Sequence, residues 1–318
     1  MRSATRILNP AAPFRVSRRD AVLALGAAAA GTVLGGRAPG AGPAPLRRPI
    51  PSSGERIPAV GLGTWQTFDV GSSPKERAPL EQVLSRFAEL GGRVVDTSPM
   101  YGRAEEVVGD LAAKLGLTES LFLATKVWTR GREAGTGQME TSERLLRKKR
   151  LDLIQVHNLL DAGTHLATLR EWKARGRILY VGVTHYTASA YGDLARLLRK
   201  EPLDFVQVNV SPVEAEAEKT ILPLARERGV AVLANRPFGG GTALRRLAGT
   251  PLPPWAPEAG CASWAQIFLK WILANPAITC VIPATSKVRH LEENMAAAEG
   301  ALPDEALRSR MAEAIASA

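Results

Sequence analysis

Short apolar runs alternate with helical patterns along most of this 318-residue chain. Eight runs occupy residues 59–65, 93–98, 121–127, 151–158, 179–186, 205–211, 231–238 and 279–286. They are apolar on both faces, as parallel strands covered by helices must be. Helical patterns occupy residues 80–90, 104–115, 138–149, 164–175, 188–200, 217–228, 264–274 and 287–299. Eight strands separated by eight helices predict an α/β fold, the (β/α)8 TIM barrel.

Segments outside this repeat predict additions to the barrel. Residues 49–56, with a Ser52-Ser53-Gly54 turn, predict an N-terminal hairpin that caps the bottom of the barrel. Residues 304–317 predict an extra amphipathic C-terminal helix outside the ring. Residues 130–137 and 239–254 predict loops, the first of them flexible.

The first 44 residues differ in composition from the rest of the chain. Basic residues lead into Ser17-Arg18-Arg19-Asp20, and an apolar run at 21–36 is followed by small residues. This order is typical of an export signal, and the arginine pair is typical of the twin-arginine (Tat) route. An uncleaved membrane anchor is the alternative, although the 16 residues of the run fall short of the roughly 20 that a span needs.

The predicted organisation is therefore a signal peptide with a small-residue linker at 1–44 and a single barrel at 45–318. We expect the Tat export machinery as a partner, a periplasmic or otherwise exported location, and no stable membrane span in the mature chain. We also expect a monomer.

The formal net charge of +10 is not concentrated on the predicted barrel. Residues 1–44 contain six Arg and one Asp, so half of that charge leaves with the signal. The remaining Lys and Arg are scattered, apart from residues 144–150, which are typical of the solvated end of a helix. We therefore expect no nucleic-acid partner.

The two cysteines, Cys261 and Cys280, have no spacing typical of metal ligands, and we expect no metal site. Outside the cytoplasm they could pair as a disulfide. The alternative is two separate buried thiols.

Four residues with proton-transfer chemistry fall at the ends of successive predicted strands. Asp96, Lys126 and His157 close three apolar runs, and Tyr101 lies five residues after Asp96 on the loop that follows. The carboxyl ends of barrel strands meet at one face, where TIM-barrel active sites lie. A carboxylate, an ammonium, an imidazole and a phenol at one face suit proton transfer to a carbonyl oxygen. Taken singly, each residue also has a structural explanation: a buried ion pair, a core histidine or a loop aromatic.

With these residues in place, the chain resembles the aldo-keto reductases over roughly residues 50–300, and within them the exported, twin-arginine-bearing subgroup. The signatures are Gly61-Leu-Gly-Thr-Trp65, Val95-Asp-Thr-Ser-Pro-Met-Tyr-Gly102, Gly182-Val-Thr-His-Tyr186, and Ile282-Pro-Ala-Thr-Ser with Glu292-Glu-Asn294. The resemblance implies an NAD(P)H-dependent oxidoreductase that reduces an aldehyde or ketone to an alcohol. NADPH is the expected cofactor, with NADH as the alternative, and a small-molecule carbonyl compound is the expected substrate.

Each member of the tetrad then has an implied role. Hydride delivery leaves an alkoxide, which Tyr101 would protonate. A free phenol, with a pKa of about 10, is a weak donor near neutral pH. Lys126 beside it is expected to lower that pKa, and Asp96 is expected to hold the ammonium. His157 would donate to the carbonyl oxygen and orient it.

The resemblance also implies a cofactor site on this face of the barrel. Thr64 and Trp65 lie on its first strand, and Thr184, His185 and Gln207 occupy the positions that hold the nicotinamide carboxamide. His185 stands where the family has Asn. It offers one hydrogen bond where Asn offers both a donor and an acceptor, so recognition of the carboxamide is expected to differ.

The remaining positions implied for the cofactor are Asn235, Arg236, Phe238, Gly239, Ser286, Lys287, Arg289, His290, Glu293 and Asn294. Asn235 stands where the family has the aromatic residue that stacks on the nicotinamide. Lys287 and Arg289 can supply positive charge for a 2′-phosphate, although a solvated basic helix face is the alternative. Glu293 and Asn294 match the positions that hold the adenine.

The departures at His185 and Asn235 motivate a second hypothesis. The barrel could be catalytically weak or inactive and act as a ligand- or partner-binding protein, which the intact tetrad argues against.

Overall fold

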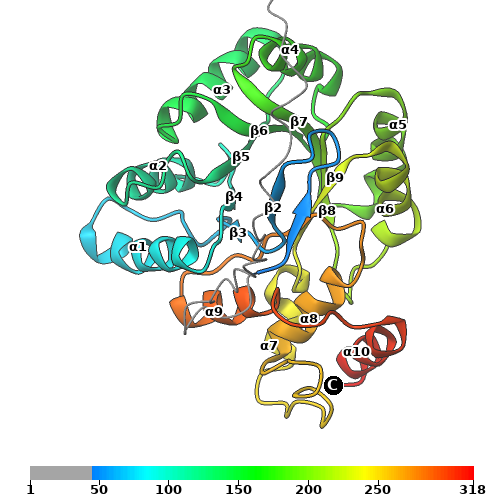
Figure 1. Ribbon diagram of the computed structural model, residues 1–318. Helices are drawn as coiled ribbons and strands as arrows, with labels where there is room; N and C mark the ends of the chain where they lie inside the picture. The colour runs from blue at the N-terminus through cyan, green and yellow to red at the C-terminus, as the bar shows by residue number, and fades with distance from the viewer. Residues whose placement is uncertain (1–44) are drawn as a thin grey trace, which may run out of the picture. The chain divides into compact units, whose positions relative to one another are not determined.

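The computed structural model describes residues 45–318, which form a closed barrel of eight parallel strands (Figure 1). The strands are β3 (Leu62–Gly63), β4 (Val94–Asp96), β5 (Phe122–Val127), β6 (Leu151–His157), β7 (Ile178–His185), β8 (Phe205–Asn209), β9 (Ala231–Asn235) and β10 (Cys280–Val281). Each pairs with the next in chain order, and parallel bridges from Val60 to Val281 and from Gly63 to Ala284 close the ring. The predicted barrel is confirmed. The predicted export signal at 1–44 lies outside the described residues.

The helices surround the strands in Figure 1. They are α1 (Pro74–Glu89), α2 (Ala104–Lys114), α3 (Arg132–Leu145), α4 (Ala162–Ala174), α5 (Tyr191–Lys200), α6 (Ala217–Arg228), α7 (Thr242–Arg246), α8 (Trp264–Leu273), α9 (Val288–Ala296) and α10 (Glu305–Ser317). Two 3-10 turns, η1 (Ala188–Ala190) and η2 (Gly239–Gly241), precede α5 and α7. As predicted, the last helix, α10, lies outside the ring, where it packs against α8.

Two loop predictions are wrong. Residues 130–137 are not a flexible loop, because α3 begins at Arg132, six residues before the predicted start. Gly135 and Gly137 lower the helix propensity of that turn, and the sequence pattern therefore did not predict it to be helical. Packing requires one of them, since a Cβ at Gly135 would lie 2.4 Å from the His165 ring. Residues 239–254 are likewise not only loop, because they contain η2 and α7.

The predicted hairpin is confirmed and closes one end of the barrel. Its strands, β1 (Arg47–Pro49) and β2 (Arg56–Pro58), pair antiparallel and lie across the end of the ring seen in Figure 1. Tyr180, at the start of β7, donates to the Glu55 carboxylate at 2.9 Å. Ile50 and Ile57 are fully buried beside Phe122 in the lower barrel interior. The hairpin does not cover the opposite end of the barrel, where the strands finish, and a functional site can lie there.

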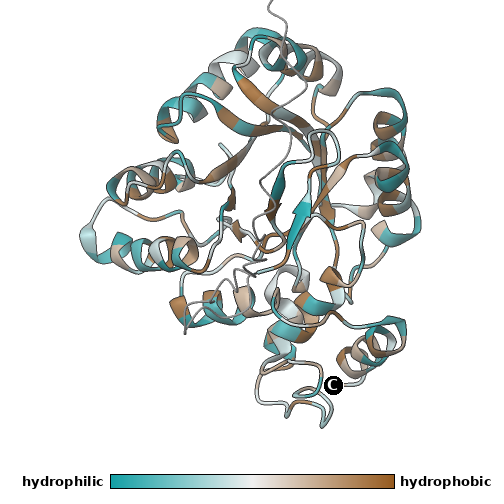
Figure 2. Ribbon diagram, viewed as in Figure 1, coloured by the Kyte–Doolittle hydropathy of each residue, from teal (hydrophilic) through white to brown (hydrophobic). Residues whose placement is uncertain are grey.

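Most of the core lies between the strands and the helices. Figure 2 shows strands that are largely hydrophobic and helices that combine one hydrophobic and one hydrophilic face. Side chains at the strand starts complete the backbone hydrogen bonds at the closed end: Asp152 accepts from Leu123 N–H, and Asp204 accepts from Val181 N–H, at 2.8 and 2.9 Å. This pairing removes the cost of unsatisfied amides where the ladder begins.

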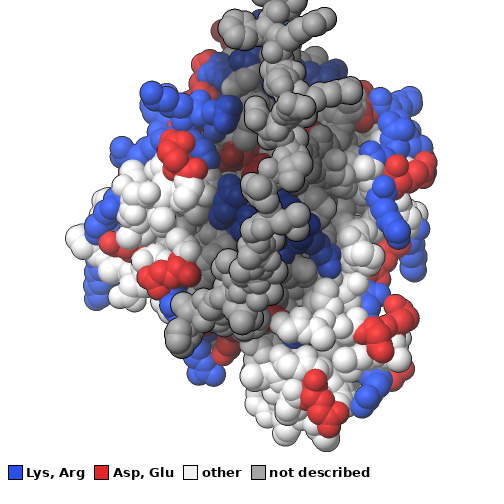
Figure 3. All heavy atoms as spheres, in the orientation of Figure 1, with Lys and Arg blue, Asp and Glu red and all other residues white. Residues whose placement is uncertain are grey.

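Cys261 and Cys280 are free and buried, which confirms the interpretation as two thiols. On the face shown in Figure 3, Lys and Arg side chains stand beside Asp and Glu around the ring. Arg177, for example, contacts both Glu140 and Glu143. Among the helices of residues 45–318, none combines the length and the apolar character needed to cross a membrane.

Candidate active site

The strand ends bring the four predicted catalytic residues together. Lys126 Nζ lies 2.9 and 2.8 Å from the two carboxylate oxygens of Asp96, and also donates to Thr97 O at 2.7 Å. The same ammonium lies 5.0 Å from the centre of the Tyr101 ring. The Tyr101 and His157 rings meet edge to face at 6.3 Å. Asp96 and Lys126 are only 3% and 1% exposed, so this is a charge pair withdrawn from water.

Two glutamines complete the hydrogen bonding of Asp96. Gln207 Nε2 donates to one carboxylate oxygen at 3.2 Å, and Gln155 Nε2 lies 3.5 Å from the other. Gln155 also donates to Gln207 Oε1 at 2.7 Å. Gln155 was absent from the predicted site. The signal was available, because it lies two residues before His157 and therefore on the same inward face of β6.

The Tyr101 phenol does not have the low pKa that its neighbour suggested. Burial raises the pKa of Tyr101 above its ordinary value, and the positive charge of Lys126 lowers it only in part. The expectation of a net decrease is therefore wrong for the protein alone, because desolvation of the phenolate outweighs the ammonium. Burial also opposes the charge on Lys126, but attraction to Asp96 and Tyr101 raises its pKa and keeps it protonated.

His157 is a neutral imidazole. Burial, followed by the charge of Lys126 and the nearby His185, lowers the pKa of His157 to about 3. Ser98 Oγ lies 3.4 Å from its Nδ1 and accepts from the Met100 N–H at 3.4 Å. The Ser98 hydroxyl can donate its hydrogen to Nδ1, and the imidazole proton is then on Nε2. In this tautomer His157 is a hydrogen-bond donor without being an acid.

The loop after His157 has an unusual backbone. Asn158, Leu159 and Asp161 all adopt left-handed conformations, with φ of 52°, 56° and 51°. Such conformations are uncommon away from glycine and gather at functional sites. Asp161 fastens the loop by accepting from the Gly131 N–H at 2.8 Å. The β6–α4 connection is thus held in one shape next to the imidazole.

The predicted carboxamide-binding residues lie at the same barrel mouth, but two have other partners. Thr184 is buried at the end of β7. The next residue, His185, accepts from the Thr187 N–H through Nδ1 at 3.1 Å and stacks on the Tyr186 ring. Both polar atoms of Gln207 contact Asp96 and Gln155. His185 and Gln207 therefore have other hydrogen-bond partners. Among the three residues, only the Thr184 side chain has no partner in the described residues.

The remaining predicted cofactor residues near the mouth have mixed environments. Thr64 is fully buried and donates to Asp96 O at 3.0 Å, whereas Trp65 is 45% exposed. Arg236 contacts the Glu214 carboxylate at 3.3 Å. Phe238 packs edge to face on Phe268 of α8 and so belongs to the core between helices.

The predicted adenosine-end residues form a separate group on the first turns of α9. Ser286, Lys287, Arg289 and His290 are exposed, and Lys287 is the N-cap residue of this helix. Arg289 pairs with Glu293 at 3.0 Å, while Asn294 is buried. No contact joins this group to the tetrad in the described part of the chain.

Large exposed hydrophobic residues mark the mouth of the barrel. Those in residues 45–318 are Trp65, Met100, Trp128, Tyr186 and Val213, and each lies on a loop that follows a strand at its carboxyl end. The Trp128 ring is 6.5 Å from the His157 ring. Apolar side chains grouped beside polar chemistry are typical of a small-molecule site. Among these five residues, the sequence analysis assigned a role only to Trp65, as a cofactor position.

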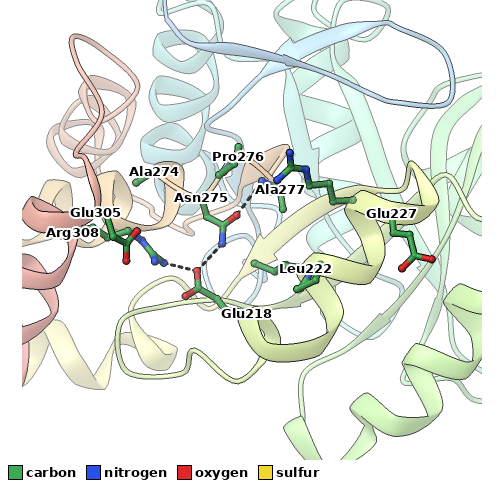
Figure 4. Close-up of a pocket in the computed structure, with 11 residues that line it drawn as sticks. Glu218, Leu222, Glu227, Ala274, Asn275, Pro276, Ala277, Glu305 and Arg308 are labelled. Carbon is green, nitrogen blue, oxygen red and sulfur yellow. Dashed lines mark hydrogen bonds and ion pairs between the residues drawn. The ribbon is translucent and has the colours of Figure 1, made fainter.

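A surface groove of about 570 Å³ lies elsewhere, between α6, residues 274–277 after α8, and α10 (Figure 4). Glu218 lines it and accepts from Arg308 and from Asn275 Nδ2. None of the predicted site residues lines this groove. No cluster of three or more His, Cys, Asp or Glu residues that could hold a metal ion occurs in residues 45–318.

Comparison with known proteins finds a matching family model, similar sequences and similar solved structures. The model of the aldo/keto reductase family matches residues 59–312. The methylglyoxal reductase YeaE of Escherichia coli (strain K12) is 29% identical over 250 residues, which cover 76% of this chain and 86% of that protein. The aldo-keto reductase yakc [NADP(+)] of Schizosaccharomyces pombe is 26% identical over 301 residues, covering 79% and 86%. The barrel also resembles a crystal structure of an aldo-keto reductase from Klebsiella pneumoniae in complex with NADPH, with a TM-score of 0.71, 24% identity, and coverage of 85% and 95%.

Proposed function

This chain belongs to the aldo/keto reductase family, and from that premise we propose that it reduces an aldehyde or ketone to an alcohol with NADPH. The observation that carries the proposal is the buried Asp96–Lys126 pair set beside Tyr101 and His157 at the barrel mouth. One relative is named as a methylglyoxal reductase and another as an aldo-keto reductase with NADP(+), and these names support the reaction class and the cofactor.

The residues after β9 fit a dinucleotide phosphate. Gly239, Gly240 and Gly241 have φ of 56°, 66° and 84°, so their backbone takes a turn that other residues rarely adopt. A Cβ at Gly240 would lie 3.1 Å from both terminal guanidinium nitrogens of Arg236 and fill the space between them. An open glycine turn beside a guanidinium suits a phosphate group. When bound, the reduced dinucleotide supplies the hydride.

The residues of this chain then handle the proton. Tyr101 donates its hydroxyl hydrogen to the carbonyl oxygen as negative charge develops there. Lys126 stabilises the resulting phenolate, and Asp96 keeps the ammonium in place. His157, neutral and protonated on Nε2, donates a hydrogen bond that orients the same oxygen. The exposed apolar side chains around the mouth shield this exchange from water.

The proposal is tested by following NADPH absorbance with a panel of aldehydes and ketones, using the wild type and Tyr101→Phe. We expect Tyr101→Phe to bind NADPH normally and to lower turnover by a factor of about 10²–10⁴, the usual contribution of acid–base catalysis. Turnover within a few-fold of wild type would remove Tyr101 from this role. Dinucleotide binding without turnover of any carbonyl compound by the wild type would favour the second hypothesis, a binding barrel.

Choice of the 2′-phosphorylated dinucleotide is proposed to depend on Lys287. Arg289 is paired with Glu293, whereas Lys287 has no acidic partner in the described residues and is the N-cap residue of α9. We expect Lys287→Ala to weaken NADPH binding about 3- to 10-fold, because one charge-assisted contact is lost, and to leave NADH binding unchanged. Lys219→Ala, an exposed lysine on α6, is the matched control. Equal losses for both dinucleotides would contradict the assignment.

We further propose that the protein belongs to a subgroup exported by the Tat route and acts as a monomer outside the cytoplasm. The Arg18-Arg19 pair before the apolar run at 21–36 supports export. The Tat route carries folded cargo, so a cofactor could be bound before transport.

A further inference from the structure

We propose that Asn209 and Asn235 accept the two amide hydrogens of the nicotinamide carboxamide in this chain. The inference rests on the proposed function, since it concerns the same dinucleotide. It assigns the two amide hydrogens of the carboxamide to residues outside the family-like set at Thr184, His185 and Gln207. Asn209 has no assigned role in the sequence prediction. Asn235 was predicted there as a cofactor position, where the family has a stacking aromatic, and had no assigned contact with the carboxamide.

The two asparagines are neighbours on the inner wall of the mouth. They end β8 and β9 and are direct partners in the parallel register. Phe205 and Gln207 on β8, and Ala231 and Leu233 on β9, face the barrel interior. Because side chains alternate along a strand, Asn209 and Asn235 face the same interior, one layer above Gln207. Adjacent strands are about 4.8 Å apart, close enough for one small group to contact both side chains.

Both side chains present a buried acceptor without a partner. The Oδ1 atoms of Asn209 and Asn235 are buried and have no hydrogen-bond donor in the described residues. Asn209 is only 7% exposed, and its Nδ2 donates to Tyr186 O at 2.7 Å, which fixes the amide with Oδ1 as the free acceptor. A buried acceptor without a donor destabilises the protein, so these two atoms indicate a site for a ligand with N–H groups.

His185 and Gln207, at the family-like positions, already have hydrogen-bond partners and do not offer free acceptors to the two amide hydrogens. His185 Nδ1 is occupied by the Thr187 N–H, and the Gln207 amide is occupied by Asp96 and Gln155. A carboxamide carries two N–H donors and one carbonyl acceptor. The two asparagine oxygens match the two donors, and the buried Thr184 hydroxyl on the adjacent strand β7 can donate to the carbonyl.

The test compares NADP⁺ with its 3-acetylpyridine analogue, which keeps the carbonyl and lacks both N–H groups. Dissociation constants are measured by quenching of tryptophan fluorescence, with thermal melting as a check on folding. We expect wild type to bind NADP⁺ more tightly than the analogue. Asn235→Ala removes an acceptor and breaks no hydrogen bond of its side chain, so it should weaken NADP⁺ binding about 3- to 10-fold and leave analogue binding unchanged within about twofold.

Asn209→Ala should give the same pattern, although it also removes the bond to Tyr186 O. The matched control is Asn158→Gly: its Oδ1 is also buried without a partner, and its φ of 52° suits glycine. This control should retain the wild-type preference for NADP⁺. If Asn235→Ala keeps the full preference, the inference is overturned and the proposed function stands. If wild type binds neither dinucleotide, both are overturned.

Discussion

Asp96 and Lys126 illustrate what a buried charge pair requires. Removing both charges from water costs several kcal/mol per ion, and the attraction between them offsets this cost only when further hydrogen bonds are present. Lys126 has the Thr97 carbonyl as an additional acceptor, and Gln155 and Gln207 donate to Asp96. The two glutamines therefore stabilise the Asp96–Lys126 pair. This role explains why the Gln207 side chain points toward Asp96.

The neutral state of His157 leads to a pH prediction. A pKa of about 3, below the ordinary 6.5, means that only about one molecule in 100 carries a protonated imidazole at pH 5. Between pH 5 and pH 8 the pH profile of wild-type turnover should therefore show no limb that is caused by titration of His157. His157→Gln should lower turnover and leave the shape of the pH profile unchanged. An acidic limb between pH 5 and pH 7 that disappears in His157→Gln would contradict the neutral donor.

Close helix packing decides where glycine is required. A Cβ on Gly109 of α2 would lie 1.9 Å from Leu145 O at the end of α3, so the two helices meet through their backbones. Gly137, inside α3, has no atom within 4 Å of its Cβ position. The two glycines look alike in the sequence and differ only in what faces them.

These two positions make a matched pair for a stability measurement. Gly109→Ala should lower the free energy of unfolding by about 1–3 kcal/mol, because the added methyl group pushes α3 away from α2. Gly137→Ala should raise it by about 0.5–1 kcal/mol, since alanine favours an open helical position. Urea denaturation of both variants checks this. Similar values for the two substitutions would mean that α2 and α3 are not in backbone contact.

At the scale of the whole molecule, the export segment and the barrel should act in sequence. A dinucleotide-dependent enzyme exported unfolded would reach a compartment not expected to supply its cofactor. Arg18→Lys with Arg19→Lys should therefore leave a soluble, folded, cofactor-competent protein in the cytoplasm. Fractionation, followed by release and measurement of the bound dinucleotide, checks this.

Wild-type protein recovered from the exported fraction should carry dinucleotide, which serves as the comparison for the double variant. Normal export of the double variant, or an exported wild type that is always empty when freshly isolated, would mean that residues 1–44 are an ordinary secretion signal and that folding follows transport.

The barrel and the tetrad could be predicted from local patterns along the chain. Strand and helix periods are local patterns, and residues such as Asp96, Lys126 and His157 must converge because all parallel strands of a barrel end at one face. Which side chains meet across that face could not be predicted in this way, because it depends on how the strands are arranged in the closed barrel. The bonds of Gln155 to Gln207, of Ser98 to His157 and the pairing of Asn209 with Asn235 depend on strand register. The net rise in the pKa of Tyr101 depends on how deeply the closed barrel buries the phenol, which no local pattern contains.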